Sequence, residues 1–95
     1  MTECKSIDEV RENIDSIDRE IVRLLSERRR YVKQAAGFKK TREDVRAPKR
    51  VEEVIAKVRT LASEREIDPD IVEKVYRTMI ACFIECEMKE HDKSQ

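Results

Sequence analysis

Two charged side chains stand at positions where helical spacing calls for apolar residues. Apolar residues recur every three or four positions up to Leu24, and the next place in that pattern holds Arg28. An apolar face that reaches Phe83 and Ile84 is likewise followed by Glu87. A charge in a protein core is costly to desolvate unless it is paired or meets a ligand. Arg28 and Glu87 therefore indicate a buried ion pair, an arginine that reaches out to solvent, or a ligand site.

Other cations share the surroundings of Arg28. Lys39 follows it by eleven residues, a helix rotation of about 1100°, so the two cations lie on one face, three turns apart. Arg11 lies about 25 Å along the same helix, and only an antiparallel partner helix would bring it back to the pair. From Arg28 to Arg50 there are ten basic and two acidic residues, a net charge of +8, and the rest of the chain carries −8. Because arginine forms paired hydrogen bonds to carboxylates and lysine supplies a compact charge, this inventory favours a small dicarboxylate ligand.

The same basic segment has two other interpretations, a solvated face and a phosphate or nucleic-acid patch. Its interleaved aromatic residues are Tyr31 and Phe38, which belong to the apolar pattern and leave no stacking platform. The whole chain has a net charge of zero, whereas general nucleic-acid binding needs a basic excess. The composition therefore excludes a general nucleic-acid binder.

The elements that position these residues are predicted to be helices. The 95 residues include one glycine and no tryptophan, and 4% are aromatic, which leaves an all-β fold without its turns and usual strand formers. We therefore expect one all-α domain over residues 1–95. A chain of this length buries only about 60% of its unfolded surface, so a core shared with another copy is expected.

The first helix is predicted over about residues 6–40. Ser6 and Glu9 have the spacing of a capping box, and no proline occurs before Pro48. A heptad seam runs along this helix, formed by Ile7, Val10, Ile14, Ile17, Ile21, Leu24, Tyr31, Ala35 and Phe38. A rod of roughly 50 Å is too long for a globule of this size, so it should pack against a second copy of itself.

Two shorter helices are predicted to follow. Segment 40–47 is polar and is expected to be a loop, and Pro48 opens a second helix that ends at about residue 64. Asp68 and Pro69 supply the N-cap and first position of a third helix, over about residues 68–90. The tail from His91 is expected to fray, which makes the single histidine exposed and a poor candidate for a catalytic base.

Composition also bears on compartment and metals. No apolar run approaches the roughly 20 residues of a membrane span, and the first residues do not resemble a signal peptide, so a cytoplasmic protein is expected. Three cysteines, Cys4, Cys82 and Cys86, are odd in number and fit a reducing compartment. Cys82 and Cys86 lack other soft ligands nearby, so we interpret them as packing residues and expect no metal site.

A family pattern runs from residue 7 to about residue 89. It consists of Ile7-Asp8-Glu9-Val10-Arg11, Ile14-Asp15, Ile17-Asp18, Ile21, Leu24-Leu25, Arg28-Arg29 and Lys39. In this pattern the chain resembles the AroQ-class chorismate mutases. Three segments are similar to the isochorismate-pyruvate lyase branch, whose members make salicylate: Tyr31-Val32-Lys33, Phe38-Lys39 and Ala47-Pro48-Lys49-Arg50-Val51. The resemblance implies an all-α fold of three helices, in an intertwined homodimer whose long first helices pair.

The resemblance also implies roles for the charged residues. Arg28 and the partner subunit's Arg11 would bind the two carboxylates of a chorismate-like substrate. Lys39 would contact the ether oxygen and one carboxylate, and Arg50 would close over the site. Glu87 matches a position where many members have a glutamine that donates to the ether oxygen. Since the rearrangement of chorismate to prephenate is unimolecular and pericyclic, no nucleophile, metal or cofactor is implied.

The chain departs from the typical mutase at substrate-contact positions. Val51 replaces a glutamate that binds the ring hydroxyl, Phe83 replaces a small polar residue as in the lyase branch, and Ile84 is expected to line the site beside it. Glu87 replaces the glutamine and must be protonated to donate a hydrogen bond. The first expectation is a chorismate mutase; the alternatives are an isochorismate-pyruvate lyase and a non-catalytic helical dimer that kept the fold.

Overall fold

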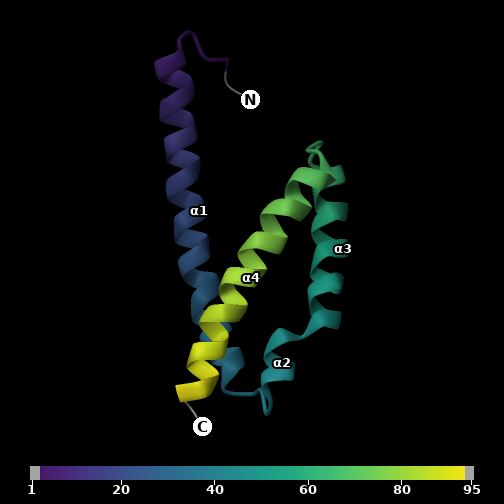
Figure 1. The fold of residues 1–95 in the computed structure, drawn as a ribbon. Helices are drawn as coiled ribbons and strands as arrows, with labels where there is room; N and C mark the ends of the chain where they lie inside the picture. Colours follow the sequence, from purple (N-terminus) through teal and green to yellow (C-terminus); the bar gives the residue numbers. More distant parts are fainter. Residues whose placement is uncertain (1–2, 94–95) are drawn as a thin grey trace. The chain divides into compact units, whose positions relative to one another are not determined.

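The computed structural model describes residues 3–93 and consists of three long helices and a short one (Figure 1). These are α1 (Ile7–Ala36), α2 (Arg42–Arg46), α3 (Pro48–Glu64) and α4 (Pro69–Lys93). No strand occurs in residues 3–93, which confirms the all-α class. The chain forms two compact units, Met1–Tyr31 and Val32–Gln95, and the division falls within α1.

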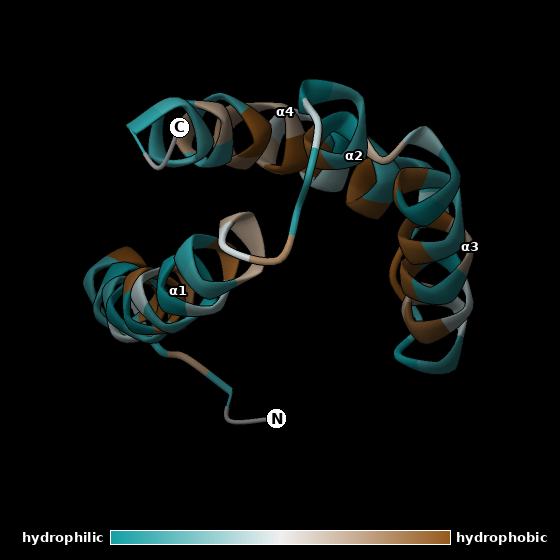
Figure 2. Ribbon diagram, turned by 90° about the horizontal axis from the view of Figure 1, so that it is seen from below, coloured by the Kyte–Doolittle hydropathy of each residue, from teal (hydrophilic) through white to brown (hydrophobic). Residues whose placement is uncertain are grey.

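The first unit holds most of α1 and the residues before it. Ser6 Oγ accepts the N–H of Glu9 at 3.1 Å, as predicted, but the Glu9 carboxylate accepts the N–H of Lys5 at 2.7 Å instead of that of Ser6. The heptad seam lies exposed in this unit, with Ile17 at 58% and Ile21 at 47% of their surface, and Figure 2 shows hydrophobic residues along α1. An apolar stripe of this length is typical of a surface that another helix covers.

α1 ends at Ala36, short of the predicted end at about residue 40. The N–H groups of residues 37–39 bond to the carbonyls three residues earlier, at 3.1, 3.0 and 3.3 Å. Such bonds tighten the last turn and satisfy carbonyls that the helix leaves open. Gly37 accounts for the position of the end, since glycine is a poor helix former.

Segment 40–47, predicted as a loop, contains α2, so that prediction was wrong for residues 42–46. Thr41 and Asp44 form a reciprocal capping box, in which each side chain accepts the other's N–H at 3.1 and 3.2 Å. Val45 anchors the helix in the core with 2% of its surface exposed. Ala47 then adopts a left-handed conformation, with φ 39° and ψ 59°, and turns the chain into α3.

α3 and α4 pack against each other and supply most of the core of the second unit (Figure 1). Pro48 occupies the first turn of α3, and Asp68 Oδ1 accepts the N–H of Asp70 at 2.9 Å at the start of α4, both as predicted. The buried apolar residues are Ala36, Val45, Ile55, Val58, Ala62 and Ile80. Over residues 3–93, no helix combines the length and apolar character needed to span a membrane.

The turn after α3 is a Schellman motif with an unusual residue in its left-handed position. The N–H of Ile67 bonds to the Ala62 carbonyl at 3.0 Å, and that of Glu66 bonds to the Ser63 carbonyl at 3.3 Å. Glu66 has a φ of 59°, where most proteins place glycine.

Ion pairs link α3 to α4 beside the core. Arg77 donates to both carboxylate oxygens of Glu52 at 2.9 Å and to Glu73 at 2.7 Å, and Arg59 donates to Asp70 and Glu73 at 2.9 and 2.8 Å. Hydrogen bonding from Arg77 lowers the pKa of both Glu52 and Glu73 below the usual value of 4.5. Exposed pairs of this kind each contribute little to stability, but together they fix how the two helices meet.

Candidate functional site

Two charged residues of the second unit that the sequence singled out, Lys39 and Glu87, lie in direct contact. Lys39 Nζ donates to Glu87 Oε1 at 3.1 Å and to the carbonyl oxygen of Asp44, also at 3.1 Å. Glu87 keeps 6% of its surface exposed, whereas 27% of the Lys39 side chain is exposed. Lys39 thus keeps a solvent-facing side on which an anion can bind, against a carboxyl group that water hardly reaches.

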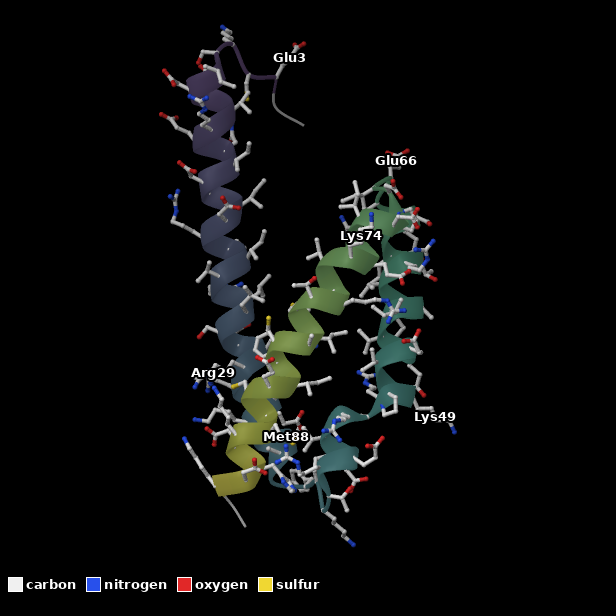
Figure 3. The ribbon with its side chains drawn as sticks, in the orientation of Figure 1. Glu3, Arg29, Lys49, Glu66, Lys74 and Met88 are labelled. Carbon is white, nitrogen blue, oxygen red and sulfur yellow. The ribbon has the colours of Figure 1, made fainter. Side chains whose placement is uncertain are left out.

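Three elements meet at this pair. Lys39 follows the last turn of α1, Asp44 belongs to α2, and Glu87 lies on the face of α4 that also holds the buried Ile80. Figure 3 labels Met88, the residue after Glu87, on the stretch of α4 that faces α2. Residue 87 is a core position, as the apolar pattern indicated, and its charge is matched by the Lys39 ammonium.

His91 is buried, which corrects the prediction of an exposed histidine in a frayed tail. α4 continues to Lys93, past the predicted end at about residue 90, and His91 has 3% of its surface exposed. Its Nε2 lies 3.1 Å from the backbone carbonyl oxygen of Lys39. The tail stays helical because segment 37–42 packs on it, a contact 52 residues apart in sequence that no local signal encodes.

Segment 37–42 is fastened to α4 at a third point. Arg42 Nη1 donates to both carboxylate oxygens of Asp92, at 2.8 and 2.7 Å. The segment is also stiffened from within, because Asp44 Oδ2 accepts the N–H groups of Lys40 and Thr41 at 3.2 Å each. These backbone hydrogen bonds lower the pKa of the Asp44 carboxyl, so the acceptor stays ionised in weak acid.

The remaining candidates of the second unit are Arg50, Val51, Phe83 and Ile84. Arg50 occupies the first turn of α3, keeps 60% of its side chain exposed and pairs with Glu53 at 3.7 Å. Val51, Phe83 and Ile84 are half-buried, Val51 on α3 and the other two on α4 one turn before Glu87. Their contact with substrate stays a prediction.

Arg11 and Arg28 lie on α1 in the first unit. Both keep the helical positions that the sequence assigned them, seventeen residues apart, which is about 25 Å along a helix. Their approach to Lys39, within one chain or between two, stays a prediction.

The described part of the chain brings together no three histidine, cysteine or acidic side chains that could hold a metal ion. Cys4, Cys82 and Cys86 are free thiols, and Cys82 is exposed. The second unit offers a fixed ammonium, a buried carboxyl and backbone groups that hold both in place.

Sequence reasoning missed two parts of the site. The Thr41-x-x-Asp44 spacing is a capping signature, and it could have revealed α2. The role of His91 had no such signal, because its partner is a backbone carbonyl in a distant segment.

A comparison with known families agrees with the all-α fold. The family model of type II chorismate mutases matches residues 10–88. The chain belongs to this family, whose substrates are chorismate-like. It is also 33% identical over 87 residues to the isochorismate pyruvate lyase of Pseudomonas aeruginosa, an alignment that covers 92% of this chain and 86% of that protein.

Proposed function

We propose that the chain is a chorismate mutase that converts chorismate to prephenate. The observation that carries the proposal is the Lys39 ammonium, held 3.1 Å from the Glu87 carboxyl in a member of this family. As the ether bond breaks, negative charge gathers on its oxygen, and Lys39 would stabilise it. Glu87, when protonated, would donate a hydrogen bond to the same oxygen. Because the reaction is unimolecular, positioning and preorganised charge supply the acceleration.

Isochorismate-pyruvate lyase is the second candidate. It is favoured by the similarity to a lyase over most of the chain and by Val51 and Phe83, which depart from the typical mutase toward that branch. The lyase reaction is also pericyclic: a hydrogen moves as pyruvate leaves, and the same cations would bind both carboxylates of the substrate.

We also propose that a second copy of the chain completes the site. The seam of α1 exposes Ile7, Ile14, Ile17, Ile21 and Leu24 by 47–60% in a single chain, and pairing with a second α1 would cover it. Antiparallel pairing would carry the partner subunit's Arg11 back toward Arg28, across the roughly 25 Å that separates them on one helix.

Turnover separates the two activities. The purified protein is incubated with chorismate and, separately, with isochorismate, and the products are analysed for prephenate and for salicylate with pyruvate. Prephenate from chorismate supports the mutase, and salicylate from isochorismate supports the lyase. Failure to turn over either substrate contradicts both activities and leaves the non-catalytic helical dimer.

A pair of neighbouring lysines provides a matched control. Lys39→Met removes the ammonium at Glu87, whereas Lys40→Met removes an exposed charge one residue away. We expect the first change to lower kcat by about a hundredfold or more, as loss of a charge-stabilising group does. The second should leave kcat within about twofold, since surface changes have small effects.

Mixing two inactive variants tests the shared site. If Arg11 acts in the partner's site, Arg11→Ala and Lys39→Met each inactivate both sites of their own homodimer. A heterodimer of the two keeps one intact site, so an equilibrated equal mixture should regain about a quarter of the natural activity by symmetry. No recovery, with subunit exchange verified by mass, would show that Arg11 does not act across the dimer.

A further inference from the structure

The buried histidine has no part in the proposed chemistry, yet it contacts the backbone of the residue that does. His91 Nε2 lies 3.1 Å from the Lys39 carbonyl oxygen, and the imidazole side chain is 4% exposed. We infer that His91 is a positioning residue, which fixes the backbone of Lys39 so that its ammonium stays at Glu87. The inference rests on the proposed function, because it deepens the role of the same site.

The hydrogen-bond pattern identifies the form of the imidazole. A carbonyl oxygen only accepts, so the proton must sit on Nε2, which donates to Lys39. Within the described residues, Nδ1 is buried and has no hydrogen-bond partner, and the nearest carboxylate, Asp92 Oδ1, is 3.9 Å away. The neutral Nε2–H tautomer leaves only a bare lone pair at Nδ1, whereas a second proton there would be a buried donor without an acceptor.

α4 thus contacts Lys39 at two points, the side-chain ammonium and the backbone carbonyl. Glu87 and His91 are four residues apart, so they lie on one helix face, one above the other. Glu87 accepts from the ammonium at 3.1 Å, and His91 donates to the carbonyl at 3.1 Å. The Lys39 N–H bonds to the Ala36 carbonyl at 3.3 Å. With its N–H and its carbonyl both fixed, Lys39 can place its ammonium without searching backbone conformations.

Loss of the imidazole bond frees one of these anchors. Segment 37–42 then keeps the Arg42–Asp92 pair, whose two side chains are about half exposed, and the Lys39–Glu87 contact. Displacement of a catalytic group by about 1 Å can cost about a hundredfold in rate. We therefore expect a loss of kcat that is large for a residue outside the reacting centre.

Two substitutions separate the hydrogen bond from the packing. His91→Phe keeps an aromatic ring of similar size and removes the donor, and we expect it to lower kcat about tenfold or more. His91→Gln places an amide N–H near the position of Nε2, and we expect it to restore most of the activity. Lys93→Met, the matched control, removes an exposed charge two residues away on the same helix and should change kcat by about twofold at most. Equal losses in all three variants would overturn the inference.

A double-mutant cycle tests whether His91 acts through Lys39. In a Lys39→Met background, His91→Phe should have little further effect on kcat, because the ammonium it positions is already gone. A full tenfold loss in that background would show that His91 acts by another route and would overturn the inference.

A spectroscopic readout keeps the test independent of turnover. His91 is the chain's only histidine, so its ring nitrogens give one pair of ¹⁵N resonances without ambiguity. We expect them to report the Nε2–H tautomer, and the Lys39 carbonyl ¹³C resonance to shift in His91→Phe but not in Lys93→Met. An Nδ1–H tautomer or an unshifted carbonyl overturns the inference even in an active enzyme. Absence of turnover in the natural protein, with these signals as expected, would contradict the proposed function alone.

Discussion

Replacing Glu87 with glutamine should change the pH dependence of the reaction more than it changes the fold. The natural carboxyl can donate to the ether oxygen only when it carries a proton, whereas the amide donates at every pH. Mutase activity should therefore rise toward acidic pH in the natural protein and stay flat in Glu87→Gln.

The expected difference in kcat between the natural protein and Glu87→Gln is the contribution of one hydrogen-bond donor at residue 87. One hydrogen-bond donor to a developing oxyanion contributes about a hundredfold to a thousandfold to kcat. At neutral pH the glutamine variant should exceed the natural enzyme by up to this factor, and the two rates should converge in acid. In the glutamine variant the amide oxygen can still accept a hydrogen bond from Lys39 Nζ. Lys39 Nζ also retains its hydrogen bond to the Asp44 carbonyl oxygen at 3.1 Å. Exchange of a charge-assisted bond for a neutral one should cost about 1 kcal/mol of stability.

The assay is kcat at saturating chorismate across an acidic to neutral pH series, with prephenate measured directly. Glu90→Gln is the matched control, because it removes the same charge from α4, where Glu90 lies 4.0 Å from Lys33. It should keep the slope of the natural protein. A flat profile in the natural protein, or an unaltered slope in Glu87→Gln, would refute the role of Glu87 as donor.

Three further predictions concern other parts of the chain. Arg28→Ala should lower turnover by about a hundredfold or more through loss of a carboxylate-binding guanidinium, with the helical circular dichroism kept; an unfolded variant would instead support a structural ion pair at this position. Glu66→Gly should raise the free energy of unfolding by about 1 kcal/mol in urea titrations, since glycine adopts a φ of 59° without strain, and an unchanged midpoint would contradict this. Arg77→Met should lower the melting temperature at neutral pH, where Glu52 and Glu73 are ionised. Because their pKa values are depressed in the folded state, this stabilisation is complete above their usual value of 4.5 and is lost as pH falls through the folded values, so the natural and variant melting temperatures should meet in strong acid.

The local signals in the sequence predicted the helices well. Ser6, Pro48 and Asp68 each act within one turn, so their effect on a helix start is readable from the residues around them. The end of α1 and the short helix α2 were missed, although each has a local signal: Gly37 for the helix end and the Thr41–Asp44 capping spacing for α2. The bonds from this segment to α4, by contrast, form only after the chain folds back, and no local signal predicts them.

The candidate site likewise contains residues that the sequence could predict and one that it could not. Glu87 could be predicted because a charge that breaks an apolar pattern is visible in spacing alone. Lys39 was singled out by a helical alignment with Arg28, and that part of the prediction was wrong, because α1 ends at Ala36 and Lys39 lies beyond it. His91 could not be predicted, because burial of a residue beyond an apolar face depends on what covers it, here segment 37–42. The residues around His91 do not indicate that its partner is a backbone carbonyl 52 residues away.

The fastening of segment 37–42 to α4 also determines when the site forms. Its contacts join residues 48, 50 and 52 positions apart, whereas α1 is held by bonds within one turn. Closing a loop of 48 residues costs about 3 kcal/mol of chain entropy from its length alone. Local helices and the shorter α3–α4 connection form sooner, because local contacts need less of the chain to be ordered first. During refolding, we therefore expect the helical signal to return before the lysine, the carboxyl and the histidine are assembled, so that their contacts are the last that the second unit acquires.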